Sequence, residues 1–265
     1  MQAMIFAAGK GTRLKPLTDV IPKALVPVGD KPLIQHVMDS LCRSGVEHVV
    51  INVHHHAGQV RNFLELAQGH YPFTISVSDE TGALLETGGG IKKAIPLFRA
   101  SEEPVLIHNV DILSNVNLAQ FYSESKGNAA TLLVSCRQTQ RYLLFDDTMH
   151  LVGWTNIATG EVRSPYPDIA SMTGKKEAVA ERFAGSMFAF SGIHTFSPLL
   201  FPLMEQWPDR FPIMDFYLKH CAEVRIKGLV KRDLRLLDVG KQDTLATAEE
   251  FIQNINNDYA EDNNT

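Results

Sequence analysis

A short apolar run near the start of the chain leads directly into a glycine-rich turn. Residues 3–6 read Ala-Met-Ile-Phe, and residues 7–14 continue Ala-Ala-Gly-Lys-Gly-Thr-Arg-Leu. The apolar run predicts a buried strand over Met4–Ala8. Glycines let the backbone adopt positive φ and approach a ligand closely, and successive amide N–H groups in such a turn can bind an anion. Arg13 and Lys23 follow, and two nearby cations favour a polyphosphate over a single carboxylate.

The turn fits neither of the two common phosphate-binding motifs. A dinucleotide-binding loop carries G-x-G-x-x-G, and Leu14 occupies the position of the third glycine. A P-loop requires a second glycine followed by lysine five positions after the first, and that position after Gly9 is again Leu14. A purely structural turn between a strand and a helix is therefore still an alternative at this point.

The pattern continues beyond the turn with Pro16-Leu17-Thr18 and with Pro-Lys-Ala-Leu-Val-Pro-Val over residues 22–28. Together with the strand and the turn, it resembles the signature of the sugar-1-phosphate nucleotidyltransferases, which join a nucleoside triphosphate to a sugar 1-phosphate. The resemblance implies that Arg13 and Lys23 are catalytic, with the lysine reaching both the α-phosphate and the sugar phosphate. The nucleotide-binding residues that it implies in this part of the chain are Ala8, Gly9, Gly11, Thr12 and Arg13, and it adds Glu80 further on.

The first half of the chain alternates strand and helix patterns. Strands are predicted over Met4–Ala8, His48–Val53, Phe73–Ser78 and Val105–Asn109, and helices over Pro32–Ser44, Gly58–Ala67 and Gly90–Leu97. This alternation predicts an α/β fold with a Rossmann-like, mainly parallel mixed sheet that carries helices on both faces. The resemblance implies the GT-A-like nucleotidyltransferase version of that architecture.

The pattern changes after about residue 141. Leu143–Phe145 and Leu151–Trp154 read as a hairpin, residues 156–176 as a polar loop or mobile flap, and Phe188–Phe196 as a strand. The remaining expected elements are helices over Pro198–Trp207, Met214–Glu223 and Asp243–Asn254, a strand within Leu229–Val239 and a frayed end over Tyr259–Thr265. We predict one domain over residues 1–265, with a nucleotide-binding half (about 1–110), a sugar-binding half (about 111–255) and a frayed tail (256–265).

Glu86-Thr87-Gly88-Gly89-Gly90 precedes the helical run Ile91–Leu97. Three glycines can form a close-approach wall against a planar base or a sugar, although a glycine-rich helix entry is often only a loop. The resemblance implies that Gly88 and Gly89 contact the nucleotide and that Glu86 and Thr87 help to shape the sugar pocket. The motif most resembles a subgroup that includes N-acetylmuramate-1-phosphate uridylyltransferases and mannose-1-phosphate guanylyltransferase-like proteins.

Two aspartates follow predicted strands. Asp111 comes after the strand that ends at Asn109, and Asp238 lies in Leu-Leu-Asp-Val-Gly over residues 236–240. Ligands of α/β sheets bind at the carboxyl ends of the strands, and carboxylate oxygens suit Mg²⁺. An aspartate that caps the next element is the alternative. The resemblance implies that both aspartates are magnesium ligands, although Val110 stands where the family pattern carries glycine.

Two further motifs suggest a sugar contact and a metal site, respectively. Phe190-Ser191-Gly192-Ile193 resembles the family's sugar-contact strand, which implies sugar contacts for Ser191, Gly192 and Asn109; a plain core strand is the alternative. His54-His55-His56 invites a metal interpretation. Consecutive residues at a strand end point to alternate sides, however, whereas a zinc site needs converging ligands. A loop next to the nucleotide half is the preferred interpretation.

Composition limits the possible partners. A formal net charge of −5 over 265 residues argues against a nucleic-acid surface. The sequence shows no signal peptide and no apolar run of membrane-spanning length. The three cysteines are widely separated and form no disulfide framework or metal-spaced pair. We expect a cytoplasmic monomer or small homo-oligomer that binds neither nucleic acid nor membrane.

The resemblance implies that the partners are UTP or GTP together with a sugar 1-phosphate, and that the cofactor is Mg²⁺. It favours an N-acetylmuramate-1-phosphate uridylyltransferase, with a mannose- or heptose-1-phosphate guanylyltransferase as the alternative. A non-catalytic, nucleotide-sugar-binding regulatory subunit would share the same fold. A dinucleotide-dependent oxidoreductase is disfavoured by the missing third glycine.

Overall fold

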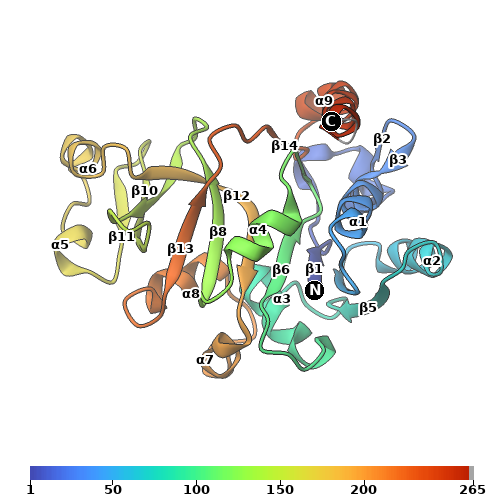
Figure 1. Cartoon of the computed structure of the whole chain (residues 1–265), viewed down its shortest axis with the longest axis horizontal. Coiled ribbons are helices and arrows are strands. Elements are labelled where there is room, and N and C mark those ends of the chain that lie inside the picture. Colours follow the sequence, from blue (N-terminus) through green and yellow to red (C-terminus); the bar gives the residue numbers. More distant parts are fainter. Residues whose placement is uncertain (263–265) are drawn as a thin grey trace.

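The central feature of the structure, a computed structural model that describes residues 1–262, is a ten-stranded mixed sheet (Figure 1). Its main path runs β11-β10-β9-β12-β6-β1-β4-β5, and β8 and β13 join it at β12. The parallel strands of the first half are β1 (Gln2–Phe6), β4 (His48–Val53), β5 (Thr74–Asp79) and β6 (Val105–Asn109). The predicted α/β fold with a mixed central sheet is confirmed.

Antiparallel strands extend the sheet beyond β6. The long strand β12 (Met187–Phe196) pairs with β6, with β8 (Ala130–Ser135) and with β9 (Arg141–Phe145). Next come β10 (Leu151–Asn156) and β11 (Glu161–Arg163), while β13 (Ile226–Val230) runs parallel to β8. Two small ribbons lie outside the sheet: β2 (Pro27–Val28) with β3 (Lys31–Pro32), and β7 (Ile112–Ser114) with β14 (Leu236–Asp238).

Helices cover both faces of the sheet because successive strand residues point to opposite sides. In β1, Ala3 and Ile5 join one core cluster, and Met4 joins the other. The first cluster packs under α1 (Leu33–Arg43), α2 (Ala57–Ala67) and α4 (Leu118–Glu124). The second packs under α3 (Glu86–Ala94), α7 (Phe201–Glu205) and α8 (Ile213–His220). The remaining helices are α5 (Pro167–Ala170), α6 (Lys176–Arg182) and α9 (Gln242–Asp262).

Residues 156–176 are not the loop or flap that the sequence predicts. They contain β11, which pairs with β10, and the short helix α5. Val162, Ile169 and Met172 are buried in a small satellite core with Val179 and Phe183 of the following segment. The prediction was wrong because these few apolar residues are widely spaced in a polar sequence and show no regular period.

Several element boundaries also differ from the prediction. Helix α3 begins at Glu86, so the three glycines lie in its first turns instead of preceding it. Residues 229–239 contribute to two strands, β13 and β14, where one was expected. Helix α9 continues to Asp262, past the start of the expected frayed end, and residues 263–265 of that prediction lie outside the described residues.

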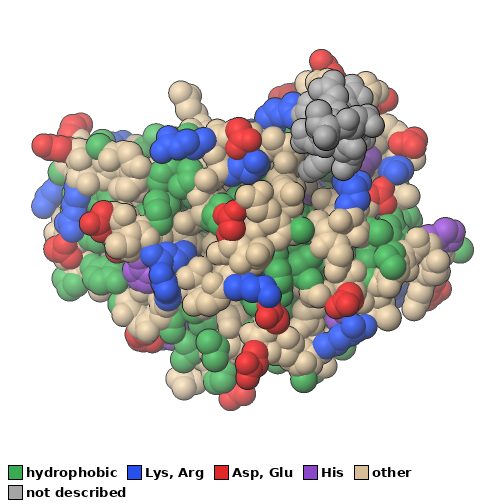
Figure 2. All heavy atoms as spheres, in the orientation of Figure 1, with side chains coloured by type: hydrophobic (Ala, Val, Ile, Leu, Met, Phe, Trp, Pro, Cys, Tyr) green, Lys and Arg blue, Asp and Glu red, His purple; other side chains and the backbone are tan. Residues whose placement is uncertain are grey.

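Charged side chains of both signs are interspersed over the face shown in Figure 2. None of the helices within residues 1–262 combines the length and the apolar character that a membrane crossing requires.

Candidate active site

A cavity of about 410 Å³ opens at the carboxyl ends of the parallel strands β1, β4 and β6. This edge of a parallel sheet is where α/β proteins bind their ligands. Thirteen residues line the cavity: Phe6, Ala8, Gly9, Lys23, Asn52, Glu80, Leu84, Glu86, Thr87, Asn109, Val110, Asp111 and Pro212. They include seven of the predicted site residues, namely Ala8, Gly9, Lys23, Glu80, Glu86, Thr87 and Asn109, as well as the predicted metal ligand Asp111.

The glycine-rich turn after β1 has the geometry of an anion cradle. Gly11 has φ 62°, and a Cβ there would lie 2.8 Å from Cγ2 of Thr18, so only glycine fits. The hydroxyl of Thr18 holds the turn by donating to the carbonyl of Gly11 at 2.8 Å. Within the part of the chain that the structure describes, no backbone acceptor takes the N–H groups of Gly9 and Lys10. These amides are free to bind phosphate oxygens.

Lys23 reaches the cavity from a single helical turn over Lys23–Leu25. Its side chain is largely buried, and its ammonium group forms an ion pair with the carboxylate of Asp111, which follows β6. A cation is thus held directly beside the glycine-rich turn.

Asp111 and Asp238 come together through the small β7–β14 ribbon. In this ribbon Asp238 pairs with Ile112, and the N–H of Val239 donates to the carbonyl of Asp111 at 2.8 Å. Arg13 approaches the same place, with Nη2 4.0 Å from Oδ2 of Asp238. Burial, and then the negative charge of Asp111, raise the pKa of Asp238, while Lys23 and Arg13 oppose that rise.

The carboxylates of Asp111 and Asp238 fit a magnesium ion whose remaining ligands would come from the substrate. Among residues 1–255, whose side chains the structure describes, there is no cluster of three or more His, Cys, Asp or Glu side chains that could hold a metal alone. Mg²⁺ is usually bound by one or two carboxylates together with substrate phosphates and waters. Asp111 and Asp238 supply that number of hard oxygen ligands beside the anion cradle.

The first turn of α3 forms a second wall of the cavity. Glu86 has φ 63°, an uncommon conformation for a residue with a side chain, and its carboxylate pairs with Arg210 at 2.9 Å. Thr87 accepts the N–H of Ile213 at its hydroxyl, at 2.9 Å. Residues 209–213 are therefore fastened to the wall that Glu86 and Thr87 present.

Gly88 and Gly89 have a different role from the predicted contact with the nucleotide. Added Cβ atoms would lie 2.2 Å from the Phe211 ring and 2.0 Å from the Asp209 carbonyl oxygen, respectively. Both N–H groups point to the carbonyl of Phe211, at 2.8 and 3.2 Å. The glycines are buried and let the 209–211 segment pack on α3, so the exposed part of the wall consists of Glu86, Thr87 and Pro212.

The predicted sugar-contact strand supports the cavity from behind. Gly192 has φ 80°, and a Cβ there would lie 2.8 Å from Nδ2 of Asn109, which lines the cavity. Ser191 is buried, and its hydroxyl accepts the N–H of Ile193 at 3.3 Å. Of these three predicted sugar contacts, the structure places only Asn109 on the cavity surface.

The three histidines each contact a backbone oxygen instead of converging on one point. Nδ1 of His54 lies 2.7 Å from the carbonyl of Glu80. Nε2 of His55 and of His56 lie 3.1 and 3.2 Å from the carbonyls of Thr18 and Asp19. His55 and His56 fasten the segment after the glycine-rich turn to the start of α2, and His54 contacts the residue after β5, in agreement with the preferred loop interpretation.

Comparison with known proteins identifies the family. The profile of the nucleotidyl transferase family matches residues 2–142, more than half of the chain. The chain belongs to this family. The match covers the glycine-rich turn, Lys23, the α3 wall and Asp111.

Named relatives of this chain carry two different substrate names. Over 111 residues it is 49% identical to the N-acetylmuramate alpha-1-phosphate uridylyltransferase of Caulobacter vibrioides, a match that covers 41% of this chain and 45% of that protein. Over 145 residues it is 30% identical to the mannose-1-phosphate guanyltransferase of Debaryomyces hansenii, with coverage of 54% and 40%. The matched part spans about half the length of these relatives or less.

A solved structure shares the fold over almost the whole chain. The crystal structure of HddC from Yersinia pseudotuberculosis superposes with a TM-score of 0.69 at 20% identity and covers 95% of this chain and 99% of that one. The fold of this chain is therefore shared well beyond the segment that the family profile matches.

Sequence reasoning missed five further lining residues: Phe6, Asn52, Leu84, Val110 and Pro212. Asn52 lies at the end of a predicted buried strand, much as Asp111 follows one, and that signal could have identified it. Leu84 and Pro212 carry no such signal, because their place depends on the packing of residues 209–213 against α3.

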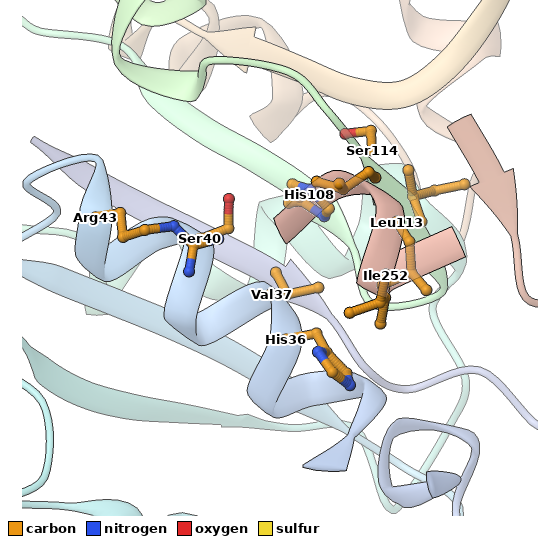
Figure 3. Close-up of a pocket in the computed structure, with 10 residues that line it drawn as sticks. His36, Val37, Ser40, Arg43, His108, Leu113, Ser114 and Ile252 are labelled. Carbon is orange, nitrogen blue, oxygen red and sulfur yellow. The ribbon is translucent and has the colours of Figure 1, made fainter. Parts of the chain in front are cut away.

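Several other cavities lie apart from the glycine-rich turn, and two of them adjoin β6 and β1. One of about 50 Å³ lies between α1, β7 and α9, where Val37, Leu113 and Ile252 approach His108 (Figure 3). A volume of that size suits water and not a nucleotide. Burial lowers the pKa of His108 to about 4.

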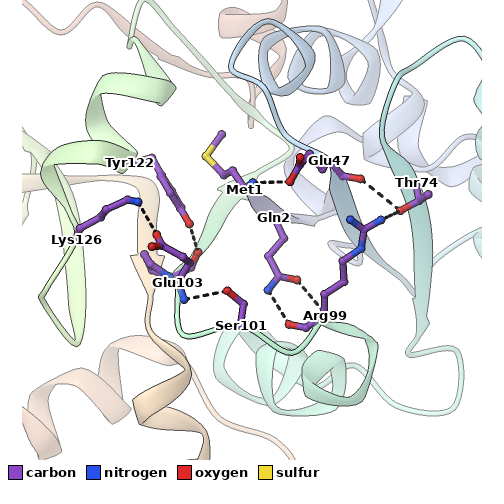
Figure 4. Close-up of polar contacts among 10 residues, drawn as sticks. Met1, Gln2, Glu47, Thr74, Arg99, Ser101, Glu103, Tyr122 and Lys126 are labelled. Carbon is purple, nitrogen blue, oxygen red and sulfur yellow. Dashed lines mark hydrogen bonds and ion pairs between the residues drawn. The ribbon is translucent and has the colours of Figure 1, made fainter.

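The second, of about 370 Å³, lies at the opposite end of β1 (Figure 4). Its charged groups pair with each other: the terminal ammonium of Met1 with Glu47 at 3.0 Å, and Lys126 with Glu103 at 2.7 Å.

Proposed function

We propose that this protein is a sugar-1-phosphate nucleotidyltransferase, which converts a nucleoside triphosphate and a sugar 1-phosphate into a nucleotide sugar and pyrophosphate. One observation carries the proposal: two cations and two carboxylates converge beside the glycine-rich turn (Arg13, Lys23, Asp111 and Asp238). A regulatory subunit that only bound a nucleotide sugar would not need this arrangement of charges at the phosphates.

The reaction is an in-line displacement at the α-phosphorus of the nucleotide. A phosphate oxygen of the sugar 1-phosphate forms the new P–O bond, and the bond to the β-phosphate oxygen breaks, so that pyrophosphate leaves with the electron pair. A phosphate monoester is already an anionic nucleophile near neutral pH, so no strong general base is required. The protein contributes by positioning the two substrates and by neutralising charge.

Three parts of the site bind the triphosphate, contact the reacting phosphates and hold the metal ion, respectively. The free amides of the glycine-rich turn bind the triphosphate, and Arg13 approaches it from the same turn. Lys23 exchanges part of its contact with Asp111 for the α-phosphate and the incoming sugar phosphate. The carboxylates of Asp111 and Asp238 would hold Mg²⁺, which, when bound, neutralises developing negative charge on the phosphates.

The substrate pair that we favour is UTP with N-acetylmuramate 1-phosphate. The 49% identity to a protein of that name supports this choice, as does the Glu-Thr-Gly-Gly-Gly segment. The 30% identity to a mannose-1-phosphate guanyltransferase supports the second candidate pair, GTP with mannose 1-phosphate. We further propose that the enzyme acts in the cytoplasm as a monomer or small homo-oligomer.

The decisive experiment measures pyrophosphate release from each of the four nucleoside triphosphates with N-acetylmuramate, mannose and heptose 1-phosphates. A mixture of UTP and GTP at equal concentration then shows which nucleotide the enzyme prefers. UDP-N-acetylmuramate as the main product is the expected result, whereas GDP-mannose would keep the reaction class and reject the favoured pair. Nucleotide binding without product from any pair would favour the regulatory subunit.

A further inference from the structure

Asn52, the penultimate residue of β4, connects the glycine-rich turn to the rest of the site. The residue is 2% exposed. Its Oδ1 accepts the N–H groups of Ala7 and Ala8, at 2.7 and 3.3 Å, and its Nδ2 donates to Oε1 of Glu80 at 2.7 Å. The first two amides of the turn are thereby fixed, which leaves the following amides of Gly9 and Lys10 to face the phosphates.

Glu80 links this arrangement to the opposite wall of the cavity. The residue is 0% exposed, and its second oxygen, Oε2, accepts the N–H of Leu85 at 3.2 Å. Leu85 immediately precedes Glu86 and Thr87, the two wall residues of α3. One carboxylate therefore holds the triphosphate turn through one oxygen and the α3 wall through the other.

The chemistry of the two groups allows only one orientation. A carboxylate accepts hydrogen bonds and cannot donate them, so the Asn52 amide must turn its NH₂ to Glu80 and its oxygen to the turn. Gly90 closes the space around them: a Cβ there would lie 3.0 Å from Oε1 of Glu80 and 3.1 Å from Nδ2 of Asn52. Burial raises the pKa of Glu80, while its hydrogen bonds from Asn52 and Leu85 act in the opposite direction.

We propose that Asn52 and Glu80 are positioning residues, with Asn52 setting the triphosphate turn and Glu80 setting both that turn and the α3 wall. Neither residue takes part in the displacement itself. The proposal rests on the proposed transferase function. It predicts that Asn52 affects binding of the nucleotide alone, whereas Glu80 affects binding of both substrates.

Steady-state kinetics test this division. Asn52→Ala leaves the Ala7 and Ala8 amides without a partner, and we expect KM for the nucleoside triphosphate to rise about tenfold while KM for the sugar 1-phosphate stays unchanged. Glu80→Ala should raise both KM values. Glu80→Gln should raise both by less, because a glutamine side chain can accept only one of the two hydrogen bonds.

Ser78→Ala is the matched control. Ser78 lies directly opposite Asn52 on β5 and is 2% exposed, and its hydroxyl has no hydrogen-bond partner among the described residues. This substitution changes the same row of the sheet without affecting the turn or the wall. Both KM values should equal those of the wild type.

Asn52→Asp should make KM for the nucleotide depend on pH, an effect that a loss of packing would not produce. The new carboxyl group faces the carboxylate of Glu80, so hydrogen bonding between them requires a shared proton. His54 and Lys93 are the other titratable groups that act on Glu80. In Asn52→Asp we expect KM for the nucleotide to fall toward the wild-type value as the pH is lowered and to increase as the pH is raised. Asn52→Ala should not show this pH dependence.

Equal rises in both KM values for Asn52→Ala, or no pH dependence in Asn52→Asp, would overturn the proposal. If the wild type turns over no substrate pair, the proposed function fails on its own. Calorimetric titration of UTP and GTP into the wild type and Asn52→Ala then tests the positioning role separately. Equal nucleotide affinity of the two proteins would reject it.

Discussion

The ammonium group of Lys23 pairs with the carboxylate of Asp111, although the two residues are 88 positions apart in the sequence. Their side chains are only 10% and 19% exposed, so water screens the pair weakly. The pair thus holds a proposed catalytic cation and a proposed metal ligand in contact beside the cavity. A substrate phosphate has to share that cation with Asp111.

Replacement of Lys23 should affect catalysis much more than stability. For Lys23→Ala we expect kcat to fall by about a hundredfold or more, because a charge at the reacting phosphate is lost. Pyrophosphate release gives kcat, and thermal unfolding gives Tm. Lys31→Ala is the control, since it removes a 2.8 Å ion pair, with Asp39, outside the cavity. A proportionate loss of Tm and rate in Lys23→Ala would instead indicate a structural role.

Asp238→Asn should lose most of its turnover without losing stability. The pKa of Asp238 is raised in the folded protein, so the folded state favours the protonated form, and ionisation as the pH rises through that pKa costs stability. A neutral amide avoids this cost near neutral pH. We expect an unchanged or higher Tm together with weak activity that excess Mg²⁺ does not restore. Near-normal kcat at saturating Mg²⁺ would reject the assignment of Asp238, and the same kinetic criterion applies to Asp111→Asn.

Gly89→Ala should disturb the α3 wall from behind. The added methyl group would lie 2.0 Å from the Asp209 carbonyl oxygen, so residues 209–213 must shift. Such overpacking costs about 1–3 kcal/mol in the free energy of unfolding, and the shift should raise KM for the sugar 1-phosphate. Urea unfolding and kinetics measure the two effects.

Gly58→Ala is the matched control for this prediction. Gly58 lies in the first turn of α2, and nothing lies within 4 Å of the position that the added methyl group would occupy. The substitution should stabilise the protein by about 0.5 kcal/mol. A destabilisation of similar size in both variants would show that the contact with residue 209 is unimportant.

His194 should make the protein less stable in acid. It lies on β12, is 1% exposed, and neither ring nitrogen has a hydrogen-bond partner among the described residues. Burial lowers its pKa to about 3. As the pH falls below about 6.5, the unfolded chain takes up a proton that the folded protein cannot accept, so stability is lost from there toward the folded pKa. His194→Leu should therefore lose less stability than the wild type between about pH 8 and about pH 5. Identical losses in urea unfolding would contradict this.

The parallel half of the sheet could be predicted because β1, β4 and β6 are nearly continuous apolar runs and β5 alternates apolar and polar residues. The predicted strands over His48–Val53 and Val105–Asn109 have the observed bounds. That Asp111 and Asp238 lie at strand ends could also be predicted. Their proximity depends on the pairing of β7 with β14, which no local pattern reveals.

The roles of Gly88 and Gly89 could not be predicted from their neighbours in sequence. Glycine is required there by a segment more than a hundred residues later, Asp209–Phe211, which packs on them. The same limit applies to Glu80, because the role of its buried carboxylate depends on contacts with Asn52 and Leu85 that the sequence does not reveal. Positions defined by long-range packing need the structure.

The position of β14 along the chain determines when the proposed magnesium site can form during synthesis. Every strand of the ten-stranded sheet has been synthesised once residue 230 is made, yet Asp238 follows only with β14. A nascent chain that stalls between these points contains the complete sheet and lacks one of the two carboxylates. On the proposed role of Asp238, a chain that ends soon after β13 has every strand of the large sheet and cannot complete the magnesium site.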